Sequence, residues 1–398
     1  MIILFISSGL FLGWTLGAND AANIFGSAVG SRMLSFTRAA VIASVFVILG
    51  AVVQGAGASG TLHRLGSVNT IGGAFTVALA AGVTVYFMTK AGLPVSTTQA
   101  IVGAIVGWSF FTDNQVDTKA LIQILTTWVT GPVLGALFAY ALYHLVRITR
   151  KRIKIHLLQY ESYIRTGLMI VGAFGAYSLG ANNIANVMGV FVPSISLGDA
   201  DFGIFVLSGA QQLFFLGGIA IAAGILTYSK KVMQTVGSNL LELTSEAAFV
   251  VVLSQALVLF IFSSSWLSGL MVRIGLPAIP LVPVSSTQVV VGSVIGIGLY
   301  KGVRNINMKV LGSIASGWIT TPVAAGLLSF ILLFFVKNLF GIDVGHSVRP
   351  SAGIAGEMNV AQIIKYSIVI LLVITAAYLV YLLLAEKKKT DRLNKKYY

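Results

Sequence analysis

The amino-acid sequence predicts an all-α polytopic membrane protein, built as an inverted repeat with discontinuous, in part re-entrant, helices. Three observations carry this prediction. The chain is 57% hydrophobic and only 10% charged, with a mean hydropathy of +0.92, far above the values of globular domains. Long apolar runs recur along the whole chain, and several short motifs occur twice in the same order.

The apolar runs mark the predicted membrane helices, because a helix needs about 20 mainly apolar residues to cross a bilayer. They are also too long and too uniformly apolar for the strands of a β-barrel. An open sheet is excluded, since its edges would leave backbone groups unpaired in lipid. The clearest runs cover residues 39–53, 123–146, 203–228, 247–262, 324–336 and 363–385.

Three pairs of motifs indicate a tandem duplication. The sequence GANDAAN (17–23) returns as GANNIAN (180–186), PVSTTQ (94–99) returns as PVSSTQ (283–288), and WVTGP (128–132) returns as WITTP (318–322). Three echoes in one order predict two repeats, which cover residues 1–146 and 160–337. A basic linker (147–159) joins them. A loop (338–360), one extra C-terminal transmembrane helix (361–385) and a basic tail (386–398) follow.

The distribution of charge predicts the orientation. The formal net charge is +14, and the basic residues cluster at 147–154 and 386–396. The positive-inside rule places both clusters in the cytoplasm. This requires an odd number of crossings in each repeat, with the N-terminus and the 338–360 loop outside, so the repeats are predicted to be inverted. A parallel, even-crossing duplication would leave the tail cluster outside.

Composition also excludes several classes of function. The positive charge has no groove-reading module or aromatic stacking platform beside it, which argues against nucleic-acid binding. The chain has no cysteine, so disulfides, thiolate metal sites and thiol catalysis are excluded.

The PVSTTQ and PVSSTQ motifs predict two helix N-termini that lie inside the membrane. Ser96 with Gln99, and Ser285 with Gln288, have the spacing of a capping box. The free N–H groups and positive end of such a helix suit an anion, and two facing ends could surround a tetrahedral oxyanion. Additional hydroxyl donors come from Thr97, Thr98, Ser286 and Thr287. Ordinary caps on two membrane-surface helices are the alternative; the duplication favours the anion site.

The GANDAAN and GANNIAN motifs predict a cation site. Side chains three or four residues apart share one helical face, which groups Asn19, Asp20 and Asn23. The second copy groups Asn182, Asn183 and Asn186 in the same way. Carboxylate and amide oxygens suit a small hard cation such as Na⁺. Amide hydrogen bonds between helices are the alternative.

Charge separates the two copies, because Asn183 stands where the first copy has Asp20. Asp20 is therefore predicted to be the charged cation ligand or the proton-sensitive group. None of the motifs contains Arg or Lys, so helix N-termini and co-bound cations would have to neutralise a bound anion. That requirement gives a physical reason for coupling the movement of anion and cation.

The duplicated motifs resemble the signature of the inorganic phosphate transporter family, which comprises sodium- or proton-coupled phosphate symporters. The resemblance covers residues 1–337. It implies discontinuous helices that meet around phosphate, and commonly a homodimer. It also implies cation binding by the six Asn and Asp residues above and phosphate contacts from Thr97, Thr98, Ser286 and Thr287, with Gln99 and Gln288 as neighbours. The short central linker indicates a compact prokaryotic form and leaves the coupling cation open.

The sequence thus predicts a secondary transporter that imports phosphate with a cation, by alternating access, through the plasma or inner membrane. Na⁺ is favoured over H⁺ as the co-transported ion, and no cofactor is expected. Some relatives carry sulfate, so an H⁺-coupled phosphate or sulfate transporter stays open. An anion channel is another alternative, but a channel needs no cation site, so the Asn and Asp motifs argue against it. An intramembrane enzyme would need a nucleophile–base pair or metal-ligand histidines, which the motifs lack.

Overall fold

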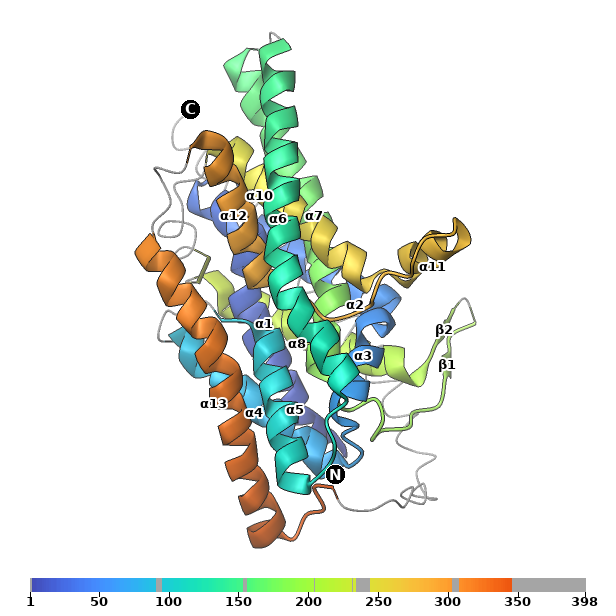
Figure 1. Cartoon of the computed structure of the whole chain (residues 1–398). Helices are drawn as coiled ribbons and strands as arrows, with labels where there is room; N and C mark the ends of the chain where they lie inside the picture. The colour runs from blue at the N-terminus through green and yellow to red at the C-terminus, as the bar shows by residue number, and fades with distance from the viewer. Residues whose placement is uncertain are drawn as a thin grey trace, which may run out of the picture.

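The fold is an α-helical bundle, as the sequence predicts (Figure 1). The computed structural model describes residues 2–90, 95–152, 156–203, 205–230, 232–233, 244–302 and 308–345. Within these ranges, eight helices are long and apolar enough to cross a membrane. The predicted C-terminal helix (361–385), the tail (386–398) and most of the preceding loop lie outside the described residues.

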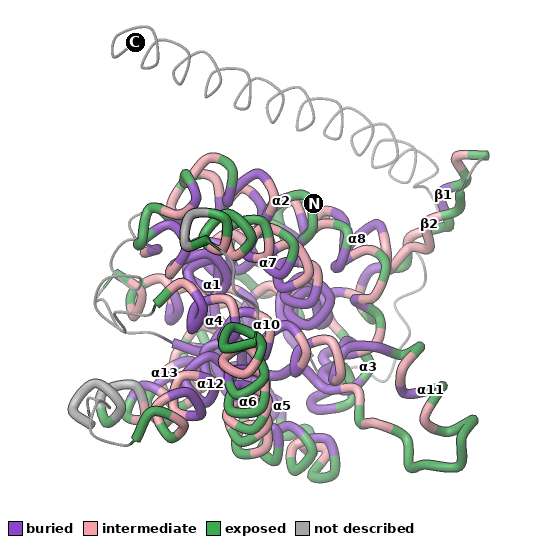
Figure 2. The backbone as a smooth tube through the Cα atoms, turned by 90° about the horizontal axis from the view of Figure 1, so that it is seen from above, coloured by how far each residue is buried: buried purple, intermediate pink, exposed green. Residues whose placement is uncertain are grey.

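Each half of the chain contributes a series of helices. The first half forms α1 (Ile2–Gly30), α2 (Phe36–Gln54), α3 (Ala56–Gly66), α4 (Ile71–Lys90), α5 (Thr97–Thr112) and α6 (Thr118–Arg152). The second half forms α7 (Leu157–Met188), α8 (Gly209–Thr227), α10 (Ser245–Ser263), α11 (Ser265–Arg273), α12 (Ser286–Lys301) and α13 (Met308–Phe340). Figure 2 shows the buried backbone gathered around α1 and its neighbours, with α11 at the periphery.

Helices α5 and α12, which begin within the PVSTTQ and PVSSTQ motifs, are called the motif helices here. Each motif helix packs on the last helix of the opposite half. A Cβ atom on Gly103 of α5 would overlap the carbonyl oxygen of Pro322 in α13. In the same way, a Cβ on Gly292 of α12 would overlap the carbonyl oxygen of Pro132 in α6. The glycines thus allow backbone contact between helices, as is common in membranes. Helices α6 and α13 run in opposite directions along the bundle (Figure 1).

The first helix of each half also packs against a helix of the opposite half. Gly17 of α1 lies against the backbone of Ile221 in α8, and Gly180 of α7 lies against the backbone of Val47 in α2. These are the glycines that open the two Asn-containing motifs. The duplicated sequence therefore coincides with a duplicated set of contacts between the halves.

At two places the helices begin or end at other residues than the apolar runs and the predicted linker do. The apolar run 203–228 does not begin as a helix: Val206–Leu207 (β2) pairs antiparallel with Ala200–Asp201 (β1), and α8 starts only at Gly209. Gly203 turns the hairpin with a φ of +80°, a conformation that glycine adopts readily. Helices also extend into the predicted linker 147–159 from both sides, since α6 continues to Arg152 and α7 begins at Leu157.

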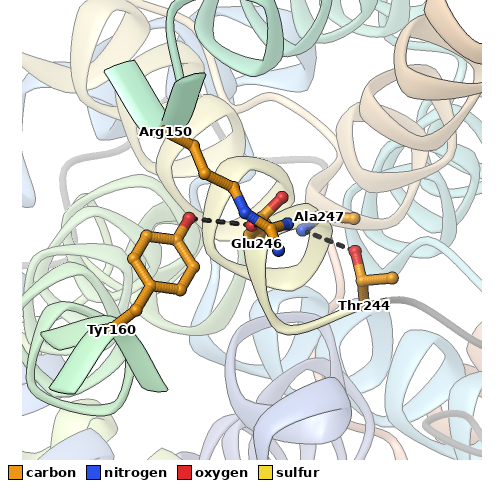
Figure 3. Close-up of polar contacts among 5 residues, drawn as sticks. All are labelled: Arg150, Tyr160, Thr244, Glu246 and Ala247. Atoms are coloured by element: carbon orange, nitrogen blue, oxygen red, sulfur yellow. Dashed lines mark hydrogen bonds and ion pairs between the residues drawn. The ribbon is translucent and has the colours of Figure 1, made fainter. Parts of the chain in front are cut away.

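One end of the bundle carries an ion pair (Figure 3). Arg150, near the end of α6, contacts Glu246 in the first turn of α10 at 2.6 Å, and Tyr160 of α7 donates to the same carboxylate oxygen at 2.8 Å. The Arg150 guanidinium also lies 5.3 Å from the centre of the Tyr160 ring. The side chain of Glu246 is only 8% exposed. Arg150, which lies within the predicted linker, is therefore bound to the second half.

Candidate functional site

The site forms where α5 and α12 begin. Ser96 and Ser285 cap these helices and accept hydrogen bonds from the backbone N–H groups of Gln99 (3.2 Å) and Gln288 (3.3 Å). Both serines are buried, at 2% and 1% exposure. Because helix geometry leaves the first N–H groups without intrahelical acceptors, each buried start presents donors and a partial positive charge inside the protein.

The predicted capping boxes are only half formed. In a complete box, the side chain of the third helical residue accepts a hydrogen bond from the cap's own backbone N–H. Gln211 does this for Ser208 at the start of α8, at 3.0 Å. The corresponding oxygens of Gln99 and Gln288 are buried without a hydrogen-bond partner in the described part of the chain. These two glutamine side chains therefore retain acceptor capacity.

The two helix starts lie side by side because each hydrogen-bonds to the segment before the other. The hydroxyl of Thr287 in α12 donates to the carbonyl of Val95 at 3.1 Å. The hydroxyl of Thr98 in α5 donates to the carbonyl of Val284 at 3.5 Å. Both valines belong to the repeated PVS segments. The two predicted anion-binding ends therefore meet, with their hydroxyl groups at the junction.

The asparagine motifs hold this junction from both sides. Asn19 of α1 donates to the carbonyl of Val95 at 3.2 Å. Asn182 of α7 donates to the carbonyl of Val284 at 2.7 Å and accepts from its N–H at 2.9 Å. The amide oxygen of Asn19 also accepts from Thr89 at 3.4 Å. Each motif therefore orients the extended segment that leads into its own half's motif helix.

The last asparagine of each motif reaches the opposite half. Asn23 lies 3.3 Å from the hydroxyls of both Ser286 and Thr287 as their donor, and Asn186 donates to Thr98 at 2.9 Å. Asn186 is fully buried, whereas Asn23 is half-buried. The junction is therefore closed at Asn186 and less covered at Asn23.

Asp20 is the buried carboxylate of the site, at 2% exposure. It accepts hydrogen bonds from Asn19 (2.8 Å), Asn183 (3.2 Å) and Ser286 (2.8 Å). No Lys, Arg or His forms an ion pair with it in the described residues; the ion pair found there joins Arg150 to Glu246. Burying a carboxylate without a counter-charge costs free energy, so binding of a cation or a proton would stabilise Asp20.

Asn183, the counterpart of Asp20, accepts hydrogen bonds from Asn182 and Asn186, both at 3.1 Å. The hydroxyl of Thr97, counterpart of Ser286, is buried without a partner in the described part of the chain. The structure thus brings together every residue that the sequence singled out. The ion-binding role of each stays a prediction.

Sequence reasoning missed three participants. The backbone carbonyls of Val95 and Val284 each accept two hydrogen bonds at the junction, and Thr89 donates to Asn19. The valines stand inside the repeated PVS segments, so their repetition was a signal. Thr89 has no such mark, because its contact with α1 depends on helix packing.

Taken together, the site offers donors to an anion and oxygens to a cation within one buried cluster. Two helix N-termini and several hydroxyls suit an oxyanion. The carboxylate of Asp20 and the neighbouring amide oxygens suit a hard cation. Binding both at once reduces the net charge that is taken out of water.

Comparisons with known proteins give the family. The model of the phosphate transporter family matches residues 16–329. A protein of Pyrococcus furiosus that is described as a candidate phosphate permease is 28% identical, covering 86% of this chain and 97% of the relative. A similarly described protein of Haemophilus influenzae is 26% identical, with coverages of 83% and 96%. A solved structure described as "The sodium-dependent phosphate transporter" shares the fold, with a TM-score of 0.68, 24% identity and coverages of 84% and 98%.

Proposed function

Because this chain belongs to the phosphate transporter family, we propose that it is a symporter that imports inorganic phosphate together with Na⁺. The carrying observation is the uncompensated carboxylate of Asp20 beside two helix starts, joined to one of them through Ser286. The solved protein with this fold is named for its sodium dependence, which supports Na⁺ as the coupling ion.

In this proposal Na⁺ binds first, to Asp20 and neighbouring amide oxygens from Asn19, Asn23, Asn182, Asn183 and Asn186. Phosphate then binds between the two helix starts, with contacts from Ser96, Thr97, Thr98, Gln99, Ser285, Ser286, Thr287 and Gln288. Electrostatics explains the coupling, because phosphate would otherwise approach the unneutralised charge of Asp20 in a site of low dielectric. Neither ion then enters the buried site at low cost without the other.

Alternating access would follow from an inverted repeat around this site. The opposite directions of α6 and α13 and the reciprocal contacts of the motif helices support that arrangement. The greater exposure of Asn23 than of Asn186 supports a conformation that is more open on one side. In the cell, we place the protein in the plasma or inner membrane as a homodimer, with the 147–159 linker and the tail in the cytoplasm.

Uptake of radioactive phosphate into proteoliposomes tests the proposal. A Na⁺ gradient, a pH gradient and no gradient are compared with the purified wild-type protein. Uptake driven by Na⁺ alone is the expected result. Uptake driven only by the pH gradient would assign the coupling to H⁺ and make Asp20 a proton carrier. Uptake of sulfate in place of phosphate would overturn the substrate.

A further inference from the structure

Two tryptophans and two glutamines leave complementary polar atoms unpaired next to the site. The indole Nε1 atoms of Trp128 and Trp318 and the amide oxygens of Gln99 and Gln288 are buried without a hydrogen-bond partner among the described residues. An indole N–H can only donate a hydrogen bond, and an amide oxygen can only accept one. Unpaired buried groups of this kind are costly, so each of the four favours a partner.

The register between α5 and α13 places the donor Trp318 opposite the acceptor Gln99. Gly103 of α5 lies against Pro322 of α13, and the contact recurs one turn later, four residues further along in both helices. The two helices therefore run parallel and in step. Carried back by one turn, the same register sets Gln99 opposite Trp318.

The second half repeats the arrangement. Gly292 of α12 lies against Pro132 of α6, and the contact again recurs four residues later in both helices. Carried back by one turn, this register sets Gln288 opposite Trp128. The two unpaired indoles and the two unpaired amides therefore form two donor–acceptor sets at equivalent places, although no sequence motif links a tryptophan to a glutamine.

Gln211 shows what a glutamine at this position does otherwise. At the start of α8 its side chain accepts the backbone N–H of Ser208 and completes the capping box. Gln99 and Gln288 occupy the same helical position behind the same type of cap but do not make this bond. Their amide oxygens are free for another donor.

We propose that Trp318 and Trp128 are positioning residues that donate their indole N–H groups, through one bridging water, to the amide oxygens of Gln99 and Gln288. Each bond would join the first turn of a motif helix to the last helix of the opposite half. It would also set the orientation of the amide, because the oxygen faces the indole and the NH₂ group is left for the anion. The inference rests on the proposed phosphate site for this last step alone.

Indole NMR tests the bonds without any transport measurement. The chain has five tryptophans, so ¹⁵N-indole signals of the detergent-solubilised protein can be assigned with single Trp→Phe variants. Gln99→Leu should shift the Trp318 signal and speed its hydrogen exchange about fivefold, the scale of one neutral hydrogen bond, and leave Trp128 unchanged. Gln288→Leu should do the reverse. Unchanged Trp318 and Trp128 signals in both variants would overturn the pairing.

Phosphate binding tests the positioning role. Trp318→Phe should weaken phosphate binding about fivefold in the wild-type background and have no further effect in Gln99→Leu. Trp266→Phe is the matched control, since Trp266 is 70% exposed on α11. Additive losses would remove the positioning role. If the protein bound no phosphate at all, the proposed function would fail while the NMR result could still establish the pairs.

Discussion

In the first half of the chain, Asn19 donates a hydrogen bond to the carbonyl of Val95, and Asn23 donates to Thr287 of the other half. In the second half, Asn182 donates to the carbonyl of Val284, and Asn186 donates to Thr98 of the other half. The hydrogen-bond pattern is therefore nearly the same on both sides of the junction. The charge is not, because Asp20 faces Asn183. In the proposed function, the duplicated geometry would support two different roles, a shared cradle for the anion and a single carboxylate for the cation.

Removing the carboxylate should have the largest effect. Asp20→Asn makes the two halves alike, so we expect Na⁺-driven phosphate uptake to fall to the background without Na⁺. Uptake into proteoliposomes measures this, with the exposed Asp113→Asn as the control.

A charge swap sharpens the comparison. Asn183→Asp added to Asp20→Asn returns one carboxylate to the other half, where Asn182 and Asn186 supply donors. Partial recovery of Na⁺-driven uptake is the expected outcome. Normal uptake in Asp20→Asn alone would show that the difference between the halves carries no function.

The glycine contacts should be equally important in the two halves. In Gly103→Ala or Gly292→Ala, the added methyl group would overlap a proline carbonyl, which is backbone and cannot rotate away. We expect each variant to lose about 3 kcal/mol of stability, the upper range for overpacking. Thermal unfolding in detergent measures this loss, and Gly269→Ala, with open space around it, is the control. A large loss at one glycine alone would contradict equivalent packing.

The sequence predicted which residues lie close together better than it predicted which of them form hydrogen bonds with one another. Repetition marked Asp20, Thr98 and Thr287 as residues that belong together, because polar motifs rarely occur twice in apolar segments by chance. It could not show that Thr98 faces Val284 of the other half, since helical periodicity describes only neighbours within one helix. Hydropathy likewise merged the β2 strand with α8, because a short apolar strand and a helix start have the same composition.

The cradle hydroxyls should have comparable, smaller effects. Thr98→Val and Thr287→Val each remove one hydroxyl and leave an asparagine amide and an anion oxygen without their partner. Each should weaken phosphate binding by about 1–3 kcal/mol, with Na⁺ binding less affected. Isothermal titration of both ions measures this, and the exposed Thr126→Val is the control. Unchanged phosphate affinity in both variants would place the anion elsewhere.

The two ends of the bundle differ as well. Residues 74–82 (AFTVALAAG) of α4 align with residues 248–256 (AFVVVLSQA) of α10, so Gly72 is the counterpart of Glu246. Gly72 packs against the backbone of Asp343, and nearby Trp108 donates to the carbonyl of Val344 at 2.6 Å. That end is held by uncharged contacts, whereas α10 is held by the ion pair with Arg150.

Salt should therefore affect only one end, and only slightly. The side chain of Arg150 is 46% exposed, so the ion pair is partly screened and should contribute about 1 kcal/mol at most. Glu246→Gln keeps an acceptor for Tyr160 but removes the charge; we expect a small loss of thermal stability at low salt that disappears at 1 M NaCl. Trp108→Phe removes the neutral bond at the other end, and its loss should be the same at both salt concentrations. If the two variants responded to salt alike, charge would not distinguish the two ends.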